Sequence, residues 1–171
     1  MTYTFATGSN TPRPRRPILP YCRESLTYRF RIGQEWWDGD LTAPIPGFGL
    51  KLPSIGRFNY HRGGMGMAII HEHGKVYIVP RYYEVVRDGV NRNHELVQYR
   101  MEIEPLIWYT VQMNTNRLMW RVDGRLLHYV DYRVPCGWLT PIFIGKGTDQ
   151  NYIGDFVTRS GAARPLTIEI K

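Results

Sequence analysis

The sequence predicts an all-β protein: an antiparallel two-sheet β-sandwich of the jelly-roll type, preceded by an extended N-terminal arm. Short apolar runs with period-two alternation recur along the chain, and turn-forming residues separate them. Apolar residues nowhere recur at helical spacing for three turns, and no repeat of fixed length is present. About ten short strands with little helix in 171 residues are typical of a sandwich or jelly roll.

The arm is predicted over residues 1–20, and the sandwich domain over residues 21–171. The first segment contains four prolines and the run "RPRRP". Because proline blocks both helical and ladder hydrogen bonds, we expect an extended segment rather than a packed element. Its start lacks the basic-then-apolar plan of a secretory signal. We therefore expect a protein made in the cytoplasm that acts there, leaves by cell lysis or enters a virus particle.

The first sandwich strand is predicted over residues 26–32, where Thr27, Arg29 and Arg31 form a basic outer face. The segment 95–104 shows the same alternation. Further strands are predicted at residues 47–52, 66–70, 75–79, 82–86, 95–104, 106–113, 117–122, 126–130, 141–145 and 165–170. In the segment 95–104 the residues expected to face the core are Val97, Tyr99, Met101 and Ile103. One buried and one wet face per strand is what two stacked antiparallel sheets require.

Composition limits the classes of partner. The chain has 22 Lys and Arg against 15 Asp and Glu, a net charge of +7, and most of the basic residues are arginine. Arginine suits bidentate contact with carboxylate, sulfate or phosphate. No apolar run approaches the roughly 20 residues that cross a bilayer, so no membrane insertion is expected. The two cysteines, Cys22 and Cys136, do not form a disulfide framework, and buried thiols are expected.

A hairpin is predicted over residues 106–128. Trp108 and Val111 lead into a turn at Asn114–Asn116, and the next strand, with Trp120, reverses at Asp123-Gly124. Asp-Gly is a strong hairpin signal because both central turn positions tolerate positive φ. This arrangement resembles the sandwich lectins and glucanases of the concanavalin A-like type.

The segment 47–147 as a whole, with "GLKLPSIG" before the hairpin and "IFIGKGTD" after it, is most similar to family-14 polysaccharide lyases. The resemblance implies a β-elimination site with Lys51 at the family's lysine. It places Met65 and Met67 at the catalytic Ser and Arg, and Tyr77 and Val79 at the Tyr-x-Tyr pair. Methionine neither holds a charge nor donates to a carboxylate, so the implied catalytic set is degenerate.

Residues outside the implied catalytic set could still act in a lyase reaction or bind a metal ion. If the chain is a lyase, the candidate catalytic residues are Lys51, Tyr77, His71 and His73. The two histidines alternate around one residue, and His61 lies nearby, but without a clear third ligand the pattern predicts surface histidines rather than a metal site. No metal or cofactor is predicted. A calcium site could use three nearby carboxylates, Glu35, Asp38 and Asp40. Their spacing is not that of a dedicated calcium loop, so we expect them to lie in a solvated turn. Asp123 is interpreted as a hairpin residue rather than an acid.

Binding is better supported than catalysis. Sugars stack on aromatic rings while polar side chains contact their hydroxyl groups. The sequence therefore predicts a lectin-like protein with an acidic polysaccharide or cell-surface glycan as partner. The predicted ligand contacts are Lys51, Arg57, Tyr77, Arg81, Trp37 and Tyr60.

The sequence is compatible with two alternative functions. The chain could be a structural protein, such as a virion decoration, fibre or tail component, that contacts neighbouring subunits through residues 1–20. It could also be an active polysaccharide lyase. Nucleic acid is disfavoured as a partner because no recognised RNA- or DNA-binding signature accompanies the basic and aromatic residues.

Overall fold

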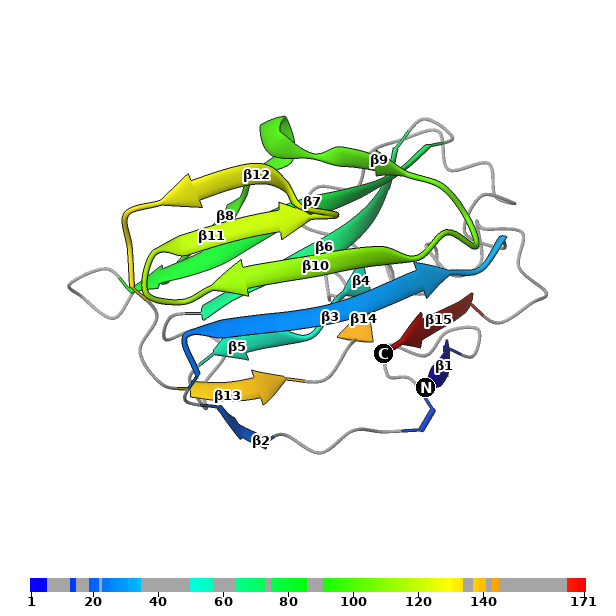
Figure 1. The fold of residues 1–171 in the computed structure, drawn as a ribbon, viewed down its shortest axis with the longest axis horizontal. Coiled ribbons are helices and arrows are strands. Elements are labelled where there is room, and N and C mark those ends of the chain that lie inside the picture. Colours follow the sequence, from blue (N-terminus) through cyan, green and yellow to red (C-terminus); the bar gives the residue numbers. More distant parts are fainter. Residues whose placement is uncertain are drawn as a thin grey trace.

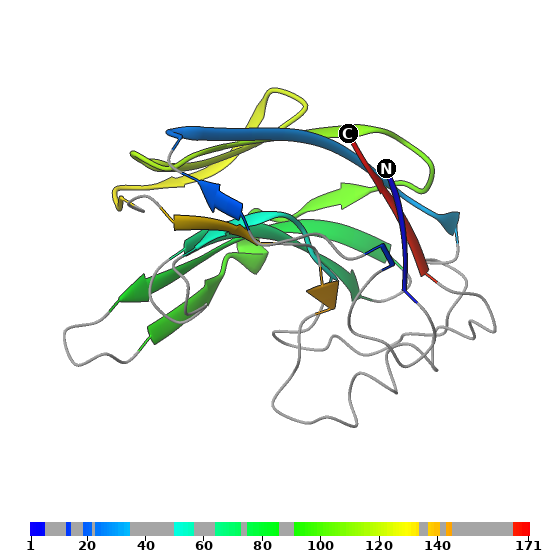
Figure 2. The same cartoon turned by 90° about the horizontal axis from the view of Figure 1, so that it is seen from below.

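The structure is a computed structural model. It describes residues 1–5, 13–14, 19–21, 23–34, 50–56, 64–72, 75–85, 91–133, 137–140, 143–144 and 166–171. Two antiparallel sheets lie face to face in these parts of the chain, which confirms the predicted β-sandwich (Figures 1 and 2). No helix in the described ranges has the length and apolar character needed to cross a membrane.

The first sheet has six strands, and its order brings the two ends of the chain together. Strands β1 and β15 lie side by side at one edge (Figure 1). In spatial order the strands are β1 (Thr2–Phe5), β15 (Leu166–Ile170), β3 (Ser25–Ile32), β10 (Tyr109–Asn114), β11 (Leu118–Val122) and β12 (Arg125–Val130).

The second sheet has nine strands built around one long pair, β6 and β7. Strands β4 and β5 both pair with β6, and strands β8 and β9 both pair with β7. The members are β2 (Leu19–Tyr21), β4 (Leu50–Lys51), β5 (Ser54–Gly56), β6 (Gly64–Glu72), β7 (Lys75–Val85), β8 (Asn91–Glu95), β9 (Met101–Ile103), β13 (Gly137–Thr140) and β14 (Phe143–Ile144).

The core lies between the two sheets and follows the alternation of the sequence. In β3 the burial pattern is strictly alternating, with Phe30 and Ile32 buried and Arg29 exposed. Val111 and Trp120 contribute from β10 and β11, and both are fully buried. Because apolar and polar residues alternate in the sequence, each of these strands has one buried face and one exposed face.

The long strand β7 differs from the prediction of two strands at 75–79 and 82–86. It runs through Pro80 without a break. Proline has no N–H for the ladder, and Pro80 lies where the outer neighbour of β7 changes from β9 to β8. There its carbonyl oxygen accepts the Leu96 N–H at 3.0 Å. The strand therefore tolerates proline because its neighbour changes at that point.

The single strand predicted over 95–104 is wrong. The chain leaves β8 at Glu95, makes a 3-10 turn, η2 (Val97–Tyr99), and re-enters the sheet as β9. Of the residues expected to face the core, Ile103 is buried, whereas Tyr99 is exposed and stacks on His128 with the ring centres 3.7 Å apart. The turn breaks the alternation, which the sequence pattern alone does not reveal.

The unpacked arm predicted over residues 1–20 is also wrong at both of its ends. Thr2–Phe5 form β1, and Tyr3 is fully buried in the core. Leu19 lies in β2, paired with β13. Between them the structure describes Arg13, whose backbone exchanges hydrogen bonds with Thr4. The described parts of this segment thus pair with the same chain.

The hairpin prediction is confirmed. Asp123 and Gly124 both have positive φ, 48° and 79°, as a two-residue turn between β11 and β12 requires. The Asp123 carboxylate accepts the Thr110 N–H at 2.7 Å, so this residue stabilises the hairpin. At the preceding turn, the side-chain oxygen of Asn114 accepts the Asn116 N–H at 2.9 Å.

Candidate functional site

The two sides of strand β6 differ in chemistry. Met65, Met67 and Ile69 point into the core and are buried there. Gly64, Gly66, Ala68 and Ile70 alternate with them and occupy the outer side. Met65 and Met67 therefore lie on the core face, not on a catalytic face, and this corrects the placement that the lyase resemblance implied.

Strand β7 supplies the larger side chains of the same outer side. Its register sets Tyr77 opposite Ile70, Val79 opposite Ala68 and Arg81 opposite Gly66. We call this surface the β6–β7 face. It consists of Gly64, Gly66, Ala68 and Ile70 on β6 and of Lys75, Tyr77, Val79, Arg81 and Tyr83 on β7.

Solvent does not reach the whole β6–β7 face. Its middle positions, Ala68 and Val79, are as buried as the core. Tyr77 and Ile70 at one end and Tyr83 at the other are half-buried. A ligand therefore has access at the Tyr77 end or the Tyr83 end, rather than along the middle.

Lys51 lies in β4, on the other side of β6 from β7, and two residues along from the level of Tyr77. Its backbone in β4 pairs with Ala68, which in turn pairs with Val79. Strands lie about 4.8 Å apart, so the Lys51 backbone is about 10 Å from β7 across β6. The Lys51 side chain lies outside what the structure describes.

Cations surround Tyr77. The guanidinium carbon of Arg100 lies 4.5 Å from the centre of the Tyr77 ring. Lys75 forms a 2.9 Å ion pair with Glu102, which lies opposite Tyr77 on β9. The hydrogen bond from Lys75 to Glu102, and then the charge of Glu102, raise the pKa of Lys75, so this ammonium group stays charged.

Arg100, which lies over the Tyr77 ring, is not among the ligand contacts predicted from the sequence. It follows the 3-10 turn η2 directly and is exposed. The outward position of Arg100 in the segment 95–104 was a usable signal. Its proximity to Tyr77 was not, because that proximity depends on β9 pairing with β7.

Arg81 has a different place from the one predicted. Only 2% of its surface is exposed, so it offers almost no area to a polysaccharide. Its guanidinium donates a hydrogen bond to the Tyr83 hydroxyl and lies 4.9 Å from the centre of that ring. Arg81 thus supports Tyr83 from below the surface, and this corrects its assignment as a direct contact.

Several predicted site residues lie outside the described part of the chain. His71 is in β6, where its backbone pairs with Val76, but its side chain is not described. Those wholly outside are Glu35, Trp37, Asp38, Asp40, Arg57, Tyr60, His61 and His73. Among the residues that are described, no group of three His, Cys, Asp or Glu side chains could hold a metal ion.

Comparison with solved structures identifies the fold. The alginate lyase Aly36B matches 99% of this chain and 77% of its own, with a TM-score of 0.56 at 14% identity. A lichenase, a β-1,3-1,4-glucanase from a mouse hindgut metagenome, matches 98% of this chain and 75% of its own, with a TM-score of 0.51 at 16% identity. No protein-family model and no curated protein matches the sequence. The chain has the concanavalin A-like jelly-roll fold of these polysaccharide-degrading enzymes.

Proposed function

We propose that this chain is a lectin-like protein that binds an anionic polysaccharide at the Tyr77 end of the β6–β7 face and does not cleave it. The observation that carries the proposal is the contact between Tyr77 and Arg100, 4.5 Å from ring centre to guanidinium carbon. It holds a planar set of N–H donors over the face of a tyrosine ring, and such donors match the carboxylate or sulfate of an acidic sugar.

The charges around this contact favour an anion. Arg100 is exposed, and the ion pair between Lys75 and Glu102 is formed by two half-exposed side chains. Such a pair is held weakly in water. A sugar carboxylate therefore competes easily with Glu102 for Lys75, while Arg100 is already oriented by the ring. The backbone of Lys51 lies on the neighbouring strand β4, where it pairs with Ala68.

Binding is favoured over cleavage because the part of β6 that carries the implied catalytic positions, Gly64 to Ile70, lacks the necessary groups. Elimination from a uronic acid chain needs a group that neutralises the carboxylate, a base and an acid. The outer positions from Gly64 to Ile70 carry no hydroxyl, imidazole or charge. The core positions between them are also apolar, so shifting the alignment by one residue does not restore the catalytic set. On β7, Val79 stands where a second tyrosine would act.

Likeness to an alginate lyase and a lichenase supports a carbohydrate partner, and the net charge of +7 directs the choice toward an anionic one. The assembly alternative gains no such support, since β1 and β2 are paired with strands of the same chain.

The test measures binding and cleavage on the same polymer. Fluorescence anisotropy with labelled alginate oligomers should give saturable binding that Arg100→Gln weakens by about tenfold, the scale of one lost charge-assisted hydrogen bond. Tyr77→Phe, which removes only the hydroxyl, should weaken it less. The control, Arg133→Gln, removes the same charge from an exposed position after β12 and should change affinity less than about twofold.

Two results would contradict the proposal. Equal losses for Arg100→Gln and Arg133→Gln would mean that binding depends on net charge alone. A rise in ultraviolet absorbance from an unsaturated uronate product would mean that the chain is a lyase, and His71, His73 and Tyr77 would then be the candidates for its acid and base.

A further inference from the structure

We propose that the six-stranded sheet carries a second, separate site for an anionic polysaccharide on its outer side. We call it the Trp108 cluster, formed by Arg29, Arg31, Lys171 and Trp108. The β6–β7 face belongs to the other sheet, so the two sheets turn these surfaces in opposite directions (Figure 2). Either site can exist without the other.

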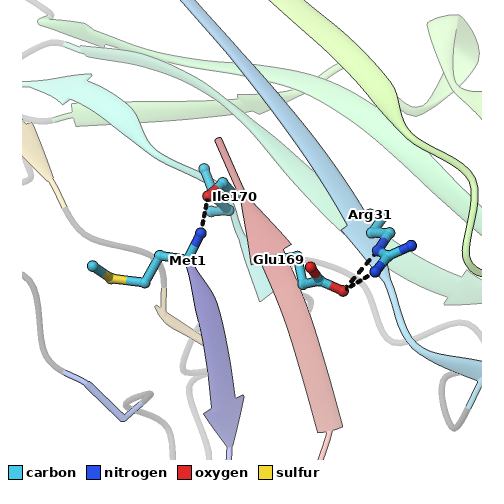
Figure 3. A network of polar contacts seen from close by, with 4 residues as sticks. All are labelled: Met1, Arg31, Glu169 and Ile170. Atoms are coloured by element: carbon cyan, nitrogen blue, oxygen red, sulfur yellow. Dashed lines mark hydrogen bonds and ion pairs between the residues drawn. The ribbon is translucent and has the colours of Figure 1, made fainter.

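The strand register brings three cations together. Arg29, in β3, lies directly opposite Lys171, the residue that follows β15, and their backbones exchange two 2.9 Å hydrogen bonds. Arg31 lies two residues along β3, and therefore on the same side. It pairs with Glu169 at 2.6 Å (Figure 3).

The indole of Trp108 holds these cations in place. Its ring centre lies 4.5 Å from the Lys171 ammonium, 5.1 Å from the Arg31 guanidinium carbon and 5.4 Å from that of Arg29. Contacts of this length to an indole ring are attractive. Trp108 thus fixes three positively charged groups around one point.

The charge of the cluster is incompletely balanced. Like charges directly opposite on neighbouring strands destabilise a sheet, and Arg29 and Lys171 have this arrangement. Glu169 neutralises Arg31, but in the described part of the chain no side-chain carboxylate forms an ion pair with Arg29 or Lys171. Both residues are exposed. An anion bound between them would remove the repulsion, and this is the physical reason for a site here.

The residues before Trp108 add an apolar margin. Leu106 and Ile107 are 57% and 47% exposed. Leu106 has a φ of 62°, a backbone conformation that costs a leucine about 1–2 kcal/mol. A hydrogen bond from its N–H to the Ile32 carbonyl oxygen, at 2.9 Å, holds it there. Exposed apolar side chains on a strained turn beside cations suit a ligand with both apolar and anionic parts.

An acidic polysaccharide fits this chemistry better than a nucleic acid does. Sequence-independent binding of single-stranded nucleic acid uses aromatic rings on which bases stack. The Trp108 ring already contacts three cations, so it does not offer such a stacking surface. A sugar chain needs only the cations of the Trp108 cluster for its acidic groups and the exposed side chains of Leu106 and Ile107 for the apolar faces of its rings.

The experiment compares two double variants of equal net charge. Arg29→Gln with Lys171→Gln removes the two opposed cations, and Arg23→Gln with Arg133→Gln removes two exposed cations elsewhere. Binding is measured by anisotropy with labelled dextran sulfate and labelled alginate oligomers over a salt series. In a two-site fit, we expect the cluster variant to lose about tenfold in affinity at one site and to show a shallower salt dependence there, and the control to lose less than about twofold at either site.

Three results would overturn this inference. They are equal losses in the two double variants, an undiminished affinity in the cluster variant, and competition by single-stranded DNA as strong as that by the polysaccharide. The same titrations in an Arg100→Gln background separate the two sites. If the cluster variant still weakens binding there by the same factor, the Trp108 cluster acts independently and stands even where the site at Tyr77 fails.

Discussion

The indole nitrogen of Trp120, in the six-stranded sheet, donates a 2.9 Å hydrogen bond to the carbonyl oxygen of Gly66, in the nine-stranded sheet. Trp120 is fully buried, and Gly66 lies between the two core methionines of β6. This bond joins the two layers beneath the β6–β7 face, so it fixes the position of β6 relative to the core.

Replacing Trp120 by Phe should destabilise the fold by about 2–4 kcal/mol. The change leaves the buried Gly66 carbonyl without its donor and creates a small cavity. Urea unfolding measures the difference. Met119→Leu, on the opposite side of β11, is the matched control and should cost less than about 1.5 kcal/mol. An unchanged unfolding midpoint for the Phe variant would mean that the bond does not contribute.

Tyr3→Ala should destabilise the protein by about 3–5 kcal/mol because a large buried side chain is removed from the core. Thr2, the neighbouring residue, is exposed. The control Thr2→Ala should change the free energy of unfolding by no more than about 0.5 kcal/mol. Thermal unfolding of both variants distinguishes a structural β1 from a free arm. If deletion of residues 1–5 left the melting temperature unchanged, the pairing of β1 with β15 would be irrelevant to stability.

Gly124→Ala should cost about 1–2 kcal/mol, and the cost should come from the backbone alone. Gly124 has a φ of 79°, yet a Cβ placed on it would meet no atom within 4 Å. Gly124→Asn should cost less, since asparagine tolerates this conformation. Denaturant titration compares the two variants. Equal losses would point to a steric cause instead.

Stability should fall at acidic pH partly through His128. Burial lowers the pKa of this imidazole, which stacks on Tyr99. The unfolded chain, with a His pKa of about 6.5, then binds a proton more readily than the folded one. The contribution of His128 is complete above that value and is lost as the pH falls through it toward the lower folded-state pKa.

The His128→Gln variant provides the measurement. Its free energy of unfolding should fall less steeply between about pH 8 and about pH 5 than that of the unchanged protein. Parallel pH profiles for the His128 variant and the unchanged protein would rule out this contribution.

The all-β class, the alternation of β3 and the turn at Asp123-Gly124 could be predicted from the amino-acid sequence. These features depend on neighbouring residues only: the two-residue period of side chains and the φ angles that Asp and Gly tolerate. For the same reason, the predictions were wrong where a local pattern was interrupted, as at η2 between β8 and β9 and at Pro80 within β7.

Three features depend on the packing of the two sheets and could not be predicted locally: the side of β6 that faces the core, the burial of Arg81 and the contact of Arg100 with Tyr77. Strand pairing also sets Arg29 opposite Lys171, two residues from distant parts of the chain. Each of these depends on which strands pair and in what register. A shift of one residue would move every side chain of a strand to the other face, and register is chosen by hydrogen bonds and packing across the whole sandwich.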